Sequence, residues 1–476
     1  MAPVKDDIFF ATATEIHQRW RAKEFSAVEL AQAFSDRLER VGPKFNALAL
    51  SLREMARRRA ADLDKEAKRE RFRGPLHGVP YGVKDLLSVA GNPTTWGAKP
   101  YAGQVFKQDA AVVEKLNKAG ALLIGKLSLV ELAGGPSYRF ASASLQGPGL
   151  NPWDITRWSG GSSSGSAAAV AAGIVPYALG SETSGSILTP AAYCGVTGLR
   201  PTYGLVSRYG AMPLSWTLDK IGPLAHSAED CGHVLAAIAG GDDRDNGSAG
   251  KGFYFAPDLV RPPGDIRAGF APTDFSDRAG EALRPALQDA LKVFREMGLK
   301  FVETELPDLP YGPMLQTILH AEAGSVFEDL IESGRVDELA DARQIAGLKA
   351  ALEVPARDYL RAMRLRQVLQ DRWRSWAAGF DVLIAPTRLS IATLITDPLD
   401  RPAAAAQTPR SRGLSDHIGA ANLAGWPALA LPCGFADGLP VSISLIGRPF
   451  TENTLLALGM EFQRRTDWHR RKPQVS

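Results

Sequence analysis

The segment between Pro75 and Pro223 constrains the fold of this 476-residue chain more than any other. Gly, Ser, Ala and Pro crowd together there, and short β-branched runs lie between frequent turn signals. This pattern predicts short strands joined by loops, and loops on a rigid scaffold are where catalytic side chains concentrate. Further along, a strand-like stretch at 266–270, a helical one at 281–297 and a strand-like one at 300–305 alternate. The chain is therefore expected to fold as an α/β protein.

Helices are predicted on both sides of this segment. Ser26 and Glu29 have the spacing of a capping box, and apolar residues recur at helical intervals from Leu30 to Val41. Charges dominate residues 53–73, which predicts a solvated helix face. Three later stretches look like strands: 382–384, 429–431 and 441–446.

The overall charge gives no sign of a polyanionic partner. Lys plus Arg number 55 against 52 Asp plus Glu, and the net charge of +3 is too small to predict binding to nucleic acid or to an acidic membrane. No apolar run is long enough for a membrane span or a secretory leader. We therefore expect small neutral substrates, with no nucleic acid, no membrane and no obligate protein partner.

The cysteines and histidines suggest neither cross-links nor metal ligation. Cys194, Cys231 and Cys433 are widely spaced, odd in number and without a CxxC pair, so neither a disulfide framework nor a zinc site is predicted. Reduced thiols suit a cytoplasmic protein. The seven histidines form no HxH or HExxH cluster, and no metal site is predicted from them.

Two short segments match the spacing of catalytic motifs, but the residues within or before them do not fit those motifs. Residues 120–127 have the spacing of a P-loop, but Leu127 stands where a Ser or Thr holds magnesium, and the interior reads as a buried strand. Residues 161–165 satisfy GxSxG around Ser163, yet a polar, Trp-rich stretch precedes them where an α/β-hydrolase needs an apolar strand.

Three other motifs form a more specific pattern. A lysine follows a short apolar stretch in Pro80-Tyr-Gly-Val-Lys84-Asp85, a glycine-serine loop runs into an Ala-rich stretch at 160–173, and a second serine loop occupies 180–187. Together these motifs resemble the amidase signature family. The interval of 24 residues between Ser162 and Ser186 equals the family's spacing between its bridging and nucleophilic serines. The resemblance extends over nearly the whole chain, through 194–202, 215–223, 423–432 and 438–448.

The resemblance implies a fold and a domain organisation. The expected architecture is an α/β amidase signature fold, in which α-helices flank both faces of a central twisted mixed β-sheet. The whole chain, 1–476, would form one amidase signature domain with a catalytic core at 75–225. Mostly helical sequence at about 311–375 marks a candidate smaller helical subdomain.

By the same resemblance, Ser186 is the expected nucleophile, Ser162 the bridging serine and Lys84 the base. A serine hydroxyl needs a base to remove its proton, and a lysine can serve only where burial keeps it neutral. The resemblance also implies a cis peptide at Gly161-Ser162. No metal ion and no organic cofactor is expected.

The nucleophile loop should also supply the oxyanion hole, from the main-chain amides of Thr183, Ser184, Gly185 and Ser186. The family usually writes this loop Asp-Thr-Gly-Gly-Ser with an Arg two positions later. Here Glu182 replaces the Asp, Ser184 replaces a Gly and Leu188 stands in place of the Arg. The paired changes at 182 and 188 predict a rebuilt internal charge pair, and catalysis is expected to survive.

Three functional hypotheses follow. The first is a stand-alone hydrolase that cleaves an amide, ester or carbamate (urethane) bond, other than a peptide bond, through a Ser186 acyl-enzyme. The second is the amidase (A) subunit of a glutamine-dependent aspartyl/glutamyl-tRNA amidotransferase, which the chain also resembles, although Ser184 and Leu188 argue against it. The third is an inactive binding scaffold, which the intact catalytic residues disfavour.

Substrate contacts are less constrained by the sequence. Gly135 and Arg208 are the candidate substrate-binding residues. The physiological substrate and leaving group depend on loops such as 388–413, and the sequence does not give the oligomeric state. Five residues are candidates for an apolar pocket: Trp96, Phe140, Tyr209, Met212 and Trp216.

Overall fold

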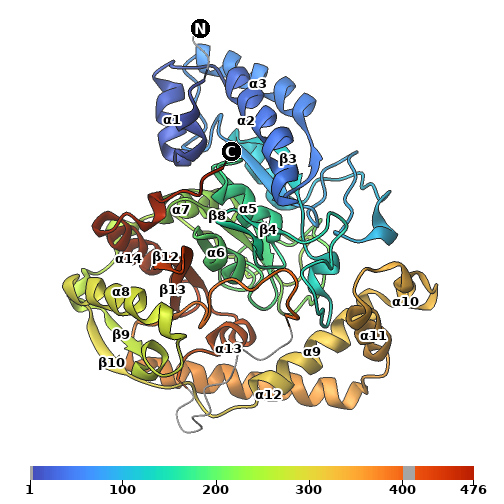
Figure 1. Cartoon of the computed structure of the whole chain (residues 1–476), viewed down its shortest axis with the longest axis vertical. Helices are drawn as coiled ribbons and strands as arrows, with labels where there is room; N and C mark the ends of the chain where they lie inside the picture. The colour runs from blue at the N-terminus through green and yellow to red at the C-terminus, as the bar shows by residue number, and fades with distance from the viewer. Residues whose placement is uncertain (1–3, 400–412, 476) are drawn as a thin grey trace.

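The structure, a computed structural model, describes residues 4–399 and 413–475 (Figure 1). The part of the 388–413 loop at 400–412 lies outside the described residues. The helices are α1 (Ala13–Arg21), α2 (Ala27–Val41), α3 (Arg53–Lys68), α4 (Ala111–Ala119), α5 (Ser164–Ala171), α6 (Leu188–Cys194), α7 (Ala228–Ile238), α8 (Arg284–Glu296), α9 (Tyr311–Val326), α10 (Glu328–Glu332), α11 (Ala342–Ala351), α12 (Ala356–Trp376), α13 (His417–Ala424) and α14 (Glu452–Arg465).

The strands are β1 (Leu48–Ser51), β2 (Pro80–Lys84), β3 (Leu122–Leu127), β4 (Leu150–Asn151), β5 (Asp154–Trp158), β6 (Tyr177–Glu182), β7 (Thr197–Arg200), β8 (Lys220–Ala225), β9 (Arg267–Phe270), β10 (Lys300–Glu303), β11 (Val382–Pro386), β12 (Ala428–Ala436) and β13 (Leu439–Gly447). In the described part of the chain, eleven of them form one sheet in the order β1-β3-β2-β6-β8-β7-β12-β13-β11-β9-β10. β4 and β5 form a separate two-stranded sheet.

The large sheet is mixed, as predicted. β2 pairs in parallel with both β3 and β6, and β9 pairs in parallel with both β10 and β11. The other neighbours in the sheet are antiparallel. Strands β2, β3, β8, β11 and β13 are buried along their whole length, as expected for strands covered on both faces.

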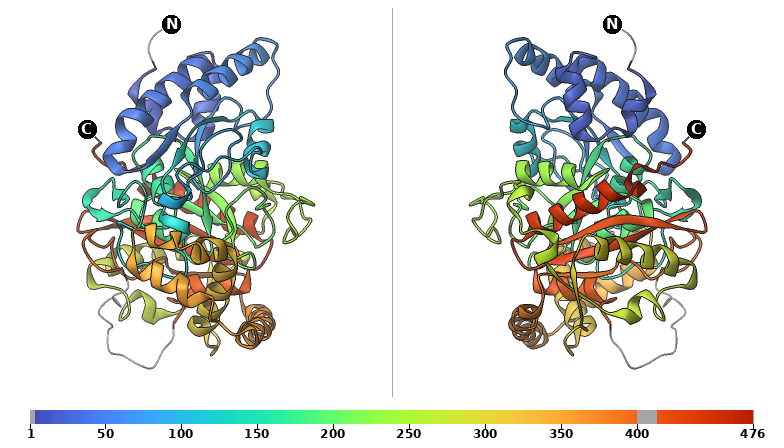
Figure 2. Two further views of the ribbon diagram at one scale, coloured as in Figure 1. Left: turned by 90° about the vertical axis from the view of Figure 1, so that its right-hand side faces the viewer. Right: turned by 90° about the vertical axis from the view of Figure 1, so that its left-hand side faces the viewer.

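Helices flank both faces of this sheet, which confirms the predicted architecture. α5 and α6 pack on one another and on strands of the catalytic region, whereas α7, α8 and α14 form a second group against β7, β8, β12 and β13. The right-hand view of Figure 2 shows α14, in red, lying across the strands. α5 is rich in Ala and fully buried, so small side chains allow it to pack closely beside the catalytic loops.

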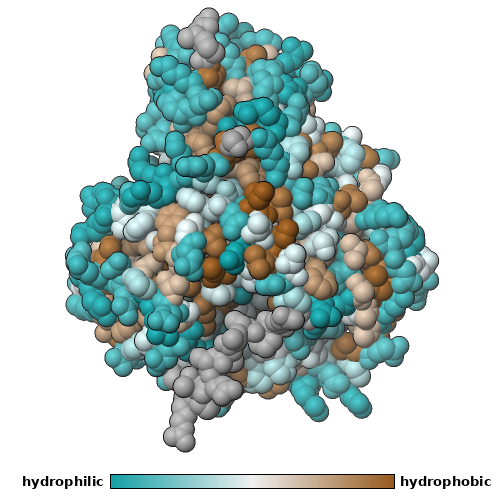
Figure 3. Space-filling model, viewed as in Figure 1, coloured by the Kyte–Doolittle hydropathy of each residue, from teal (hydrophilic) through white to brown (hydrophobic). Residues whose placement is uncertain are grey.

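The N-terminal helices follow the predicted pattern. Ser26 Oγ accepts a hydrogen bond from the Glu29 amide at 3.1 Å, and Glu29 Oε2 accepts one from the Ser26 amide at 2.7 Å, so the capping box begins α2. Leu30, Phe34 and Leu38 on this helix are fully buried. On the face shown in Figure 3, this end of the molecule is mostly hydrophilic.

The segment at 311–376 consists of helices α9 to α12, which Figure 1 shows far from α1 to α3. Glu322 of α9 accepts hydrogen bonds from Ser215 Oγ at 2.5 Å and Thr217 Oγ1 at 2.8 Å, which ties this segment to the loop before β8. The division of the chain into a single domain, a core and a subdomain stays a prediction. Among the helices of the described residues, none has the length and apolar character that crossing a membrane requires.

Candidate active site

Lys84 is the last residue of β2 and is fully buried. Its Nζ donates hydrogen bonds to Ser162 Oγ at 2.7 Å and to Ser181 Oγ at 3.0 Å. β2 and β6 are parallel neighbours, so their carboxyl ends, which carry Lys84 and Ser181, meet at one edge of the sheet. The sheet topology therefore explains how a lysine and two distant serines come together.

The surroundings of Lys84 favour its neutral form. Burial lowers the pKa of Lys84 from 10.5 to about 7, because the ammonium loses its hydration. Asp219 and Glu182 act in the opposite direction without reversing this shift. At neutral pH a substantial fraction of Lys84 is therefore neutral and able to accept a proton.

The loop that carries Ser162 needs glycine at two positions. Gly160 has a φ of +84°, and a Cβ there would lie 2.6 Å from Pro190 Cα. At Gly161, a Cβ would lie 2.6 Å from the Trp158 ring. The peptide between Gly161 and Ser162 is cis, as the resemblance implies.

Ser186 lies on the loop between β6 and α6 and is half-buried. Its main-chain oxygen accepts a hydrogen bond from the amide of Ser163 at 3.2 Å, which holds the nucleophile loop against the loop of Ser162. The contact between Lys84 and Ser162 is present. The roles of Lys84, Ser162 and Ser186 as base, bridge and nucleophile stay predictions.

Glu182 organises the main chain after Ser186. Its Oε2 accepts hydrogen bonds from the amides of Ile187 at 2.8 Å and Leu188 at 3.0 Å, where α6 begins. Among the described residues, no group accepts a hydrogen bond from the amides of residues 184–186. These amides are available to a substrate oxygen, and their role as the oxyanion hole stays a prediction.

The internal charge pair expected at Glu182 is present. Arg200 of β7 donates from Nη1 to Glu182 Oε1 at 2.8 Å, and both side chains are fully buried. Asn422 of α13 donates to the same oxygen at 2.8 Å. Burial alone would raise the pKa of Glu182, but Arg200 and Asn422 lower it to about 2. The cation lost at Leu188 is therefore supplied by β7, which β8 separates from β6 in the sheet.

Thr183 fixes the other end of the nucleophile loop. Its Oγ1 donates to Asp219 Oδ1 at 2.6 Å, and the other oxygen of Asp219 accepts from the amides of Leu214 and Ser215 at 2.8 and 2.9 Å. Burial raises the pKa of Asp219. The loop is thus anchored by side chains on both sides of residues 184–186.

A cavity of about 440 Å³, here named the Thr183 cavity, adjoins this site, with Ser181, Thr183 and Asp219 in its wall. Four predicted pocket residues also line it: Arg208, Tyr209, Met212 and Trp216. Gly135, Trp96 and Phe140 are not among its lining residues. Arg208 pairs with Asp245 at 2.5 Å, so its charge is already compensated. The substrate roles of Gly135 and Arg208 stay predictions.

A second cavity, of about 630 Å³, lies beside the same loop, with Ser184 and Thr189 in its wall. Arg388 and Asp416 line it too. Ser184, which replaces the family's usual glycine, therefore lines a cavity. The nucleophile loop contributes residues to two cavities.

The rejected motifs have other roles. Lys126, in the stretch with P-loop spacing, belongs to the buried strand β3, and its Nζ lies 2.7 Å from Asp85 Oδ1. Ser163 is fully buried, and its Oγ accepts a hydrogen bond from the Ser181 amide at 3.3 Å, which does not suit a nucleophile. The strand before it, β5, belongs to the small sheet.

Sequence reasoning missed three residues of this site: Ser181, Arg200 and Asp219. Each lies within a quoted family motif, at 180–187, 194–202 or 215–223. Each is a polar residue at a fixed position of its motif, and this position was the signal by which the sequence could have identified it as a site residue. In residues 4–399 and 413–475, no group of three or more His, Cys, Asp or Glu side chains is arranged to hold a metal ion.

Curated relatives match the chain along its whole length. It is 37% identical over 498 residues to the A subunit of glutamyl-tRNA(Gln) amidotransferase from Carboxydothermus hydrogenoformans, a match that covers 98% of this chain and 100% of the relative. The protein of the same name from Desulforudis audaxviator is 37% identical over 491 residues, with 98% of each chain covered.

These relatives correct one expectation. A chain without nucleic acid or an obligate protein partner was predicted, but the relatives are named as one subunit of a tRNA amidotransferase. The prediction was wrong because a net charge of +3 describes the whole chain and says nothing about a local interface. Leu188, which argued for a stand-alone enzyme, is fully buried and says nothing about the surface either.

Solved structures agree with the fold. The chain superposes with a TM-score of 0.86 on a protein described as part of a vestigial complex that reveals the origins of an s-triazine catabolic enzyme, at 30% identity over 98% of this chain and 100% of that one. The peptide amidase of Stenotrophomonas maltophilia gives a TM-score of 0.83 at 32% identity over 98% of this chain and 99% of that one. The sequence model described as Amidase matches residues 29–456. The chain therefore belongs to the amidase signature family, and it is an amidase-family enzyme that acts on carbon–nitrogen bonds.

Proposed function

We propose that this chain hydrolyses a carboxamide as the amidase subunit of a multi-subunit tRNA amidotransferase, with glutamine as the amide donor. The observation that carries the proposal is the full-length similarity to the corresponding subunit of such enzymes. A buried Lys84 in contact with Ser162, beside a nucleophile loop with available amides, supports the same chemistry.

In the proposed reaction, the Oγ of Ser186 attacks the carbonyl carbon of the amide. Its proton passes to Ser162, which gives its own proton to neutral Lys84. Return of a proton along the same route to the nitrogen lets ammonia leave and forms the acyl-enzyme. Water then attacks the acyl carbon through the same relay and releases the acid, which restores Ser186.

The negative charge on the attacked oxygen would be stabilised by the amides of residues 183–186. Losing one such donor costs roughly 3–4 kcal/mol of transition-state stabilisation in known oxyanion holes. Glu182 supports this arrangement by holding the next two amides. The ammonia would be used by partner subunits to amidate the aminoacyl-tRNA, and the cytoplasm is the proposed location, which three free cysteines suit.

A second candidate is hydrolysis of another amide, an ester or a carbamate with an aromatic group. The observation that favours it is the wall of the Thr183 cavity, where Tyr209, Met212 and Trp216 provide apolar surface. This candidate uses the same acyl-enzyme and the same relay.

The test assays the chain alone and after co-expression with the remaining amidotransferase subunits. Ammonia release from glutamine and cleavage of matched p-nitroanilide, p-nitrophenyl ester and carbamate substrates are measured side by side. We expect the partners to raise glutamine hydrolysis and Ser186→Ala to abolish it. If glutamine is untouched in the complex while an aryl substrate is cleaved, the second candidate replaces the first.

A further inference from the structure

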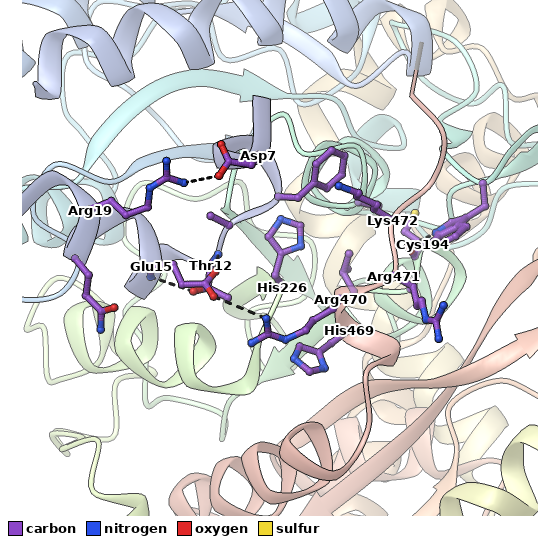
Figure 4. Close-up of a pocket in the computed structure, with 17 residues that line it drawn as sticks. Asp7, Thr12, Glu15, Arg19, Cys194, His226, His469, Arg470, Arg471 and Lys472 are labelled. Carbon is purple, nitrogen blue, oxygen red and sulfur yellow. Dashed lines mark hydrogen bonds and ion pairs between the residues drawn. The ribbon is translucent and has the colours of Figure 1, made fainter. Parts of the chain in front are cut away.

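A cavity of about 450 Å³, here named the terminal cavity, lies between the two ends of the chain (Figure 4). Residues 7–19 form one side and residues 469–472 another, with Cys194 to Val196 and His226 between them. None of Lys84, Ser162 and Ser186 lines it. Cavities of roughly 300–1,000 Å³ hold small organic ligands, so the volume fits a small molecule.

Four cationic side chains, Arg19, Arg470, Arg471 and Lys472, line the cavity. Two of them have close carboxylate partners: Arg19 pairs with Asp7 at 3.0 Å and with Glu24 at 2.8 Å, and Arg471 pairs with Asp467 at 2.7 Å. Arg470 has only Glu15 at the limit of ion-pair distance, at 4.0 Å. Arg470 and Lys472 are therefore the cations whose charge is least compensated.

Lys472 has no carboxylate partner within residues 4–399 and 413–475, and its Nζ lies 5.1 Å from the centre of the Phe10 ring. Its charge therefore remains available to a ligand.

His226 provides a fixed polar group inside the cavity. His226 is only 8% exposed, and its Nε2 has no hydrogen-bond partner in the described part of the chain. Figure 4 shows the imidazole between Thr12 and Lys472. Burial and the nearby His469 lower the pKa of His226 to about 4, so the ring is neutral at pH 7. A buried ring nitrogen without a partner is costly, and a bound acceptor would remove that cost.

One side of the cavity is apolar. Phe10, Trp153 and Val196 line it, and the indole nitrogen of Trp153 already donates to the Cys194 carbonyl at 2.9 Å. Aromatic and aliphatic surface beside cations suits an anion that carries an organic group. A bare inorganic ion would leave this surface uncovered.

We propose that the terminal cavity binds a small organic phosphate monoester. Arg470 and Lys472 hold the phosphate, His226 donates from Nε2 to one of its oxygens, and the organic group packs on the apolar side. A phosphate monoester carries about −1.5 to −2 charges at pH 7 and offers three acceptor oxygens, which suits two weakly compensated cations, Arg470 and Lys472, beside the donor on His226. A carboxylate would supply half that charge.

The first measurement is isothermal titration of the purified chain with phenyl phosphate, inorganic phosphate and benzoate at constant ionic strength. We expect saturable one-to-one binding of phenyl phosphate, weaker binding of inorganic phosphate and no measurable binding of benzoate. Ser186→Ala should bind like wild type, because the cavity does not include the catalytic residues; failure of the proposed hydrolysis would therefore leave this result unaffected. No saturable binding of phenyl phosphate, or equal binding of benzoate, would overturn the proposal.

The second measurement removes the cations. The double variant Arg470→Ala, Lys472→Ala should weaken phenyl phosphate binding at least tenfold. The matched control, Lys292→Ala with Arg374→Ala, removes the same charge from exposed positions on α8 and α12 and should bind like wild type. Equal weakening in both double variants would mean non-specific attraction and would overturn the site. His226→Gln, which keeps a donor, should bind more tightly than His226→Leu, with folding checked by thermal unfolding.

Discussion

Two buried lysines on neighbouring strands have opposite surroundings. Lys84 ends β2 and Lys126 lies near the end of the parallel strand β3, where Val83 and Lys126 are paired in register. Both side chains are fully buried. Nζ of Lys126 lies 2.7 Å from Asp85 and donates to the Pro93 carbonyl at 2.8 Å, whereas Nζ of Lys84 contacts the hydroxyls of two serines.

The difference teaches that burial alone does not make a lysine a base. Burial lowers the pKa of both lysines, but the ion pair with Asp85 opposes that effect at Lys126. Asp85 follows Lys84 in the sequence, yet its carboxylate is directed to Lys126. The lysine that meets only neutral hydroxyls is the one suited to accept a proton.

The largest expected effect comes from removing Lys84 itself. Lys84→Ala and Ser186→Ala should each reduce kcat/KM by more than about a thousandfold, and by similar factors, since members of a relay act as one unit. Steady-state hydrolysis assays measure this. A Lys84→Ala enzyme that keeps a tenth of the wild-type rate would show that Lys84 is not the base.

Removing Asp85 should affect stability. Asp85→Ala leaves Lys126 buried without a counter-charge, which is expected to lower the free energy of unfolding by about 3–5 kcal/mol. Urea unfolding followed by circular dichroism measures the change. The double variant Asp85→Leu, Lys126→Met is the control and should recover most of the loss, because no unpaired charge remains. An unstable double variant would contradict the ion-pair explanation.

The comparison can be sharpened by giving Lys84 the environment of Lys126. In Ser181→Asp, a carboxylate on the wall of the Thr183 cavity would face Lys84 and raise its pKa. Activity at pH 7 should fall about tenfold or more and recover towards pH 9, as Lys84 loses its proton. Ser181→Asn, similar in size and uncharged, should keep the wild-type pH profile. If both variants respond alike, charge at this position does not control the base.

The smallest effect is the pH dependence of the wild-type enzyme. With the pKa of Lys84 at about 7, kcat/KM should fall as pH decreases through 7, to about half of its plateau at pH 7 and by about tenfold per pH unit further down. The same shift makes folding stability rise with pH between about 7 and 10.5, because the unfolded chain binds the extra proton in that range. A pH profile that is flat from 6 to 9 would contradict the shifted pKa of Lys84.

Some features of the structure could be predicted from residue spacing and from the family motifs. The capping box at Ser26 could be predicted from residue spacing, and the mixed sheet from the family motifs. The contact between Lys84 and Ser162 was also expected, although 78 residues separate them.

The contacts in the site that could not be predicted from the sequence depend on the order of the strands in the sheet. Ser181 reaches Lys84 because β6 lies beside β2, and Arg200 reaches Glu182 because β7 ends near the nucleophile loop. Neither neighbour relation can be read from local patterns. The partner prediction failed for a different reason, since it inferred an interface from whole-chain charge and from the buried residue Leu188.

The contact between Glu182 and Asn422 has a consequence for biosynthesis. The loop that carries Ser186 is complete when about two fifths of the chain has left the ribosome, but the amide of Asn422 that helps hold Glu182 lies 240 residues downstream. A nascent chain that has not yet exposed α13 lacks part of the support for this loop. Domains commonly fold as units during synthesis, so we expect the hydrolase to become active only late in translation.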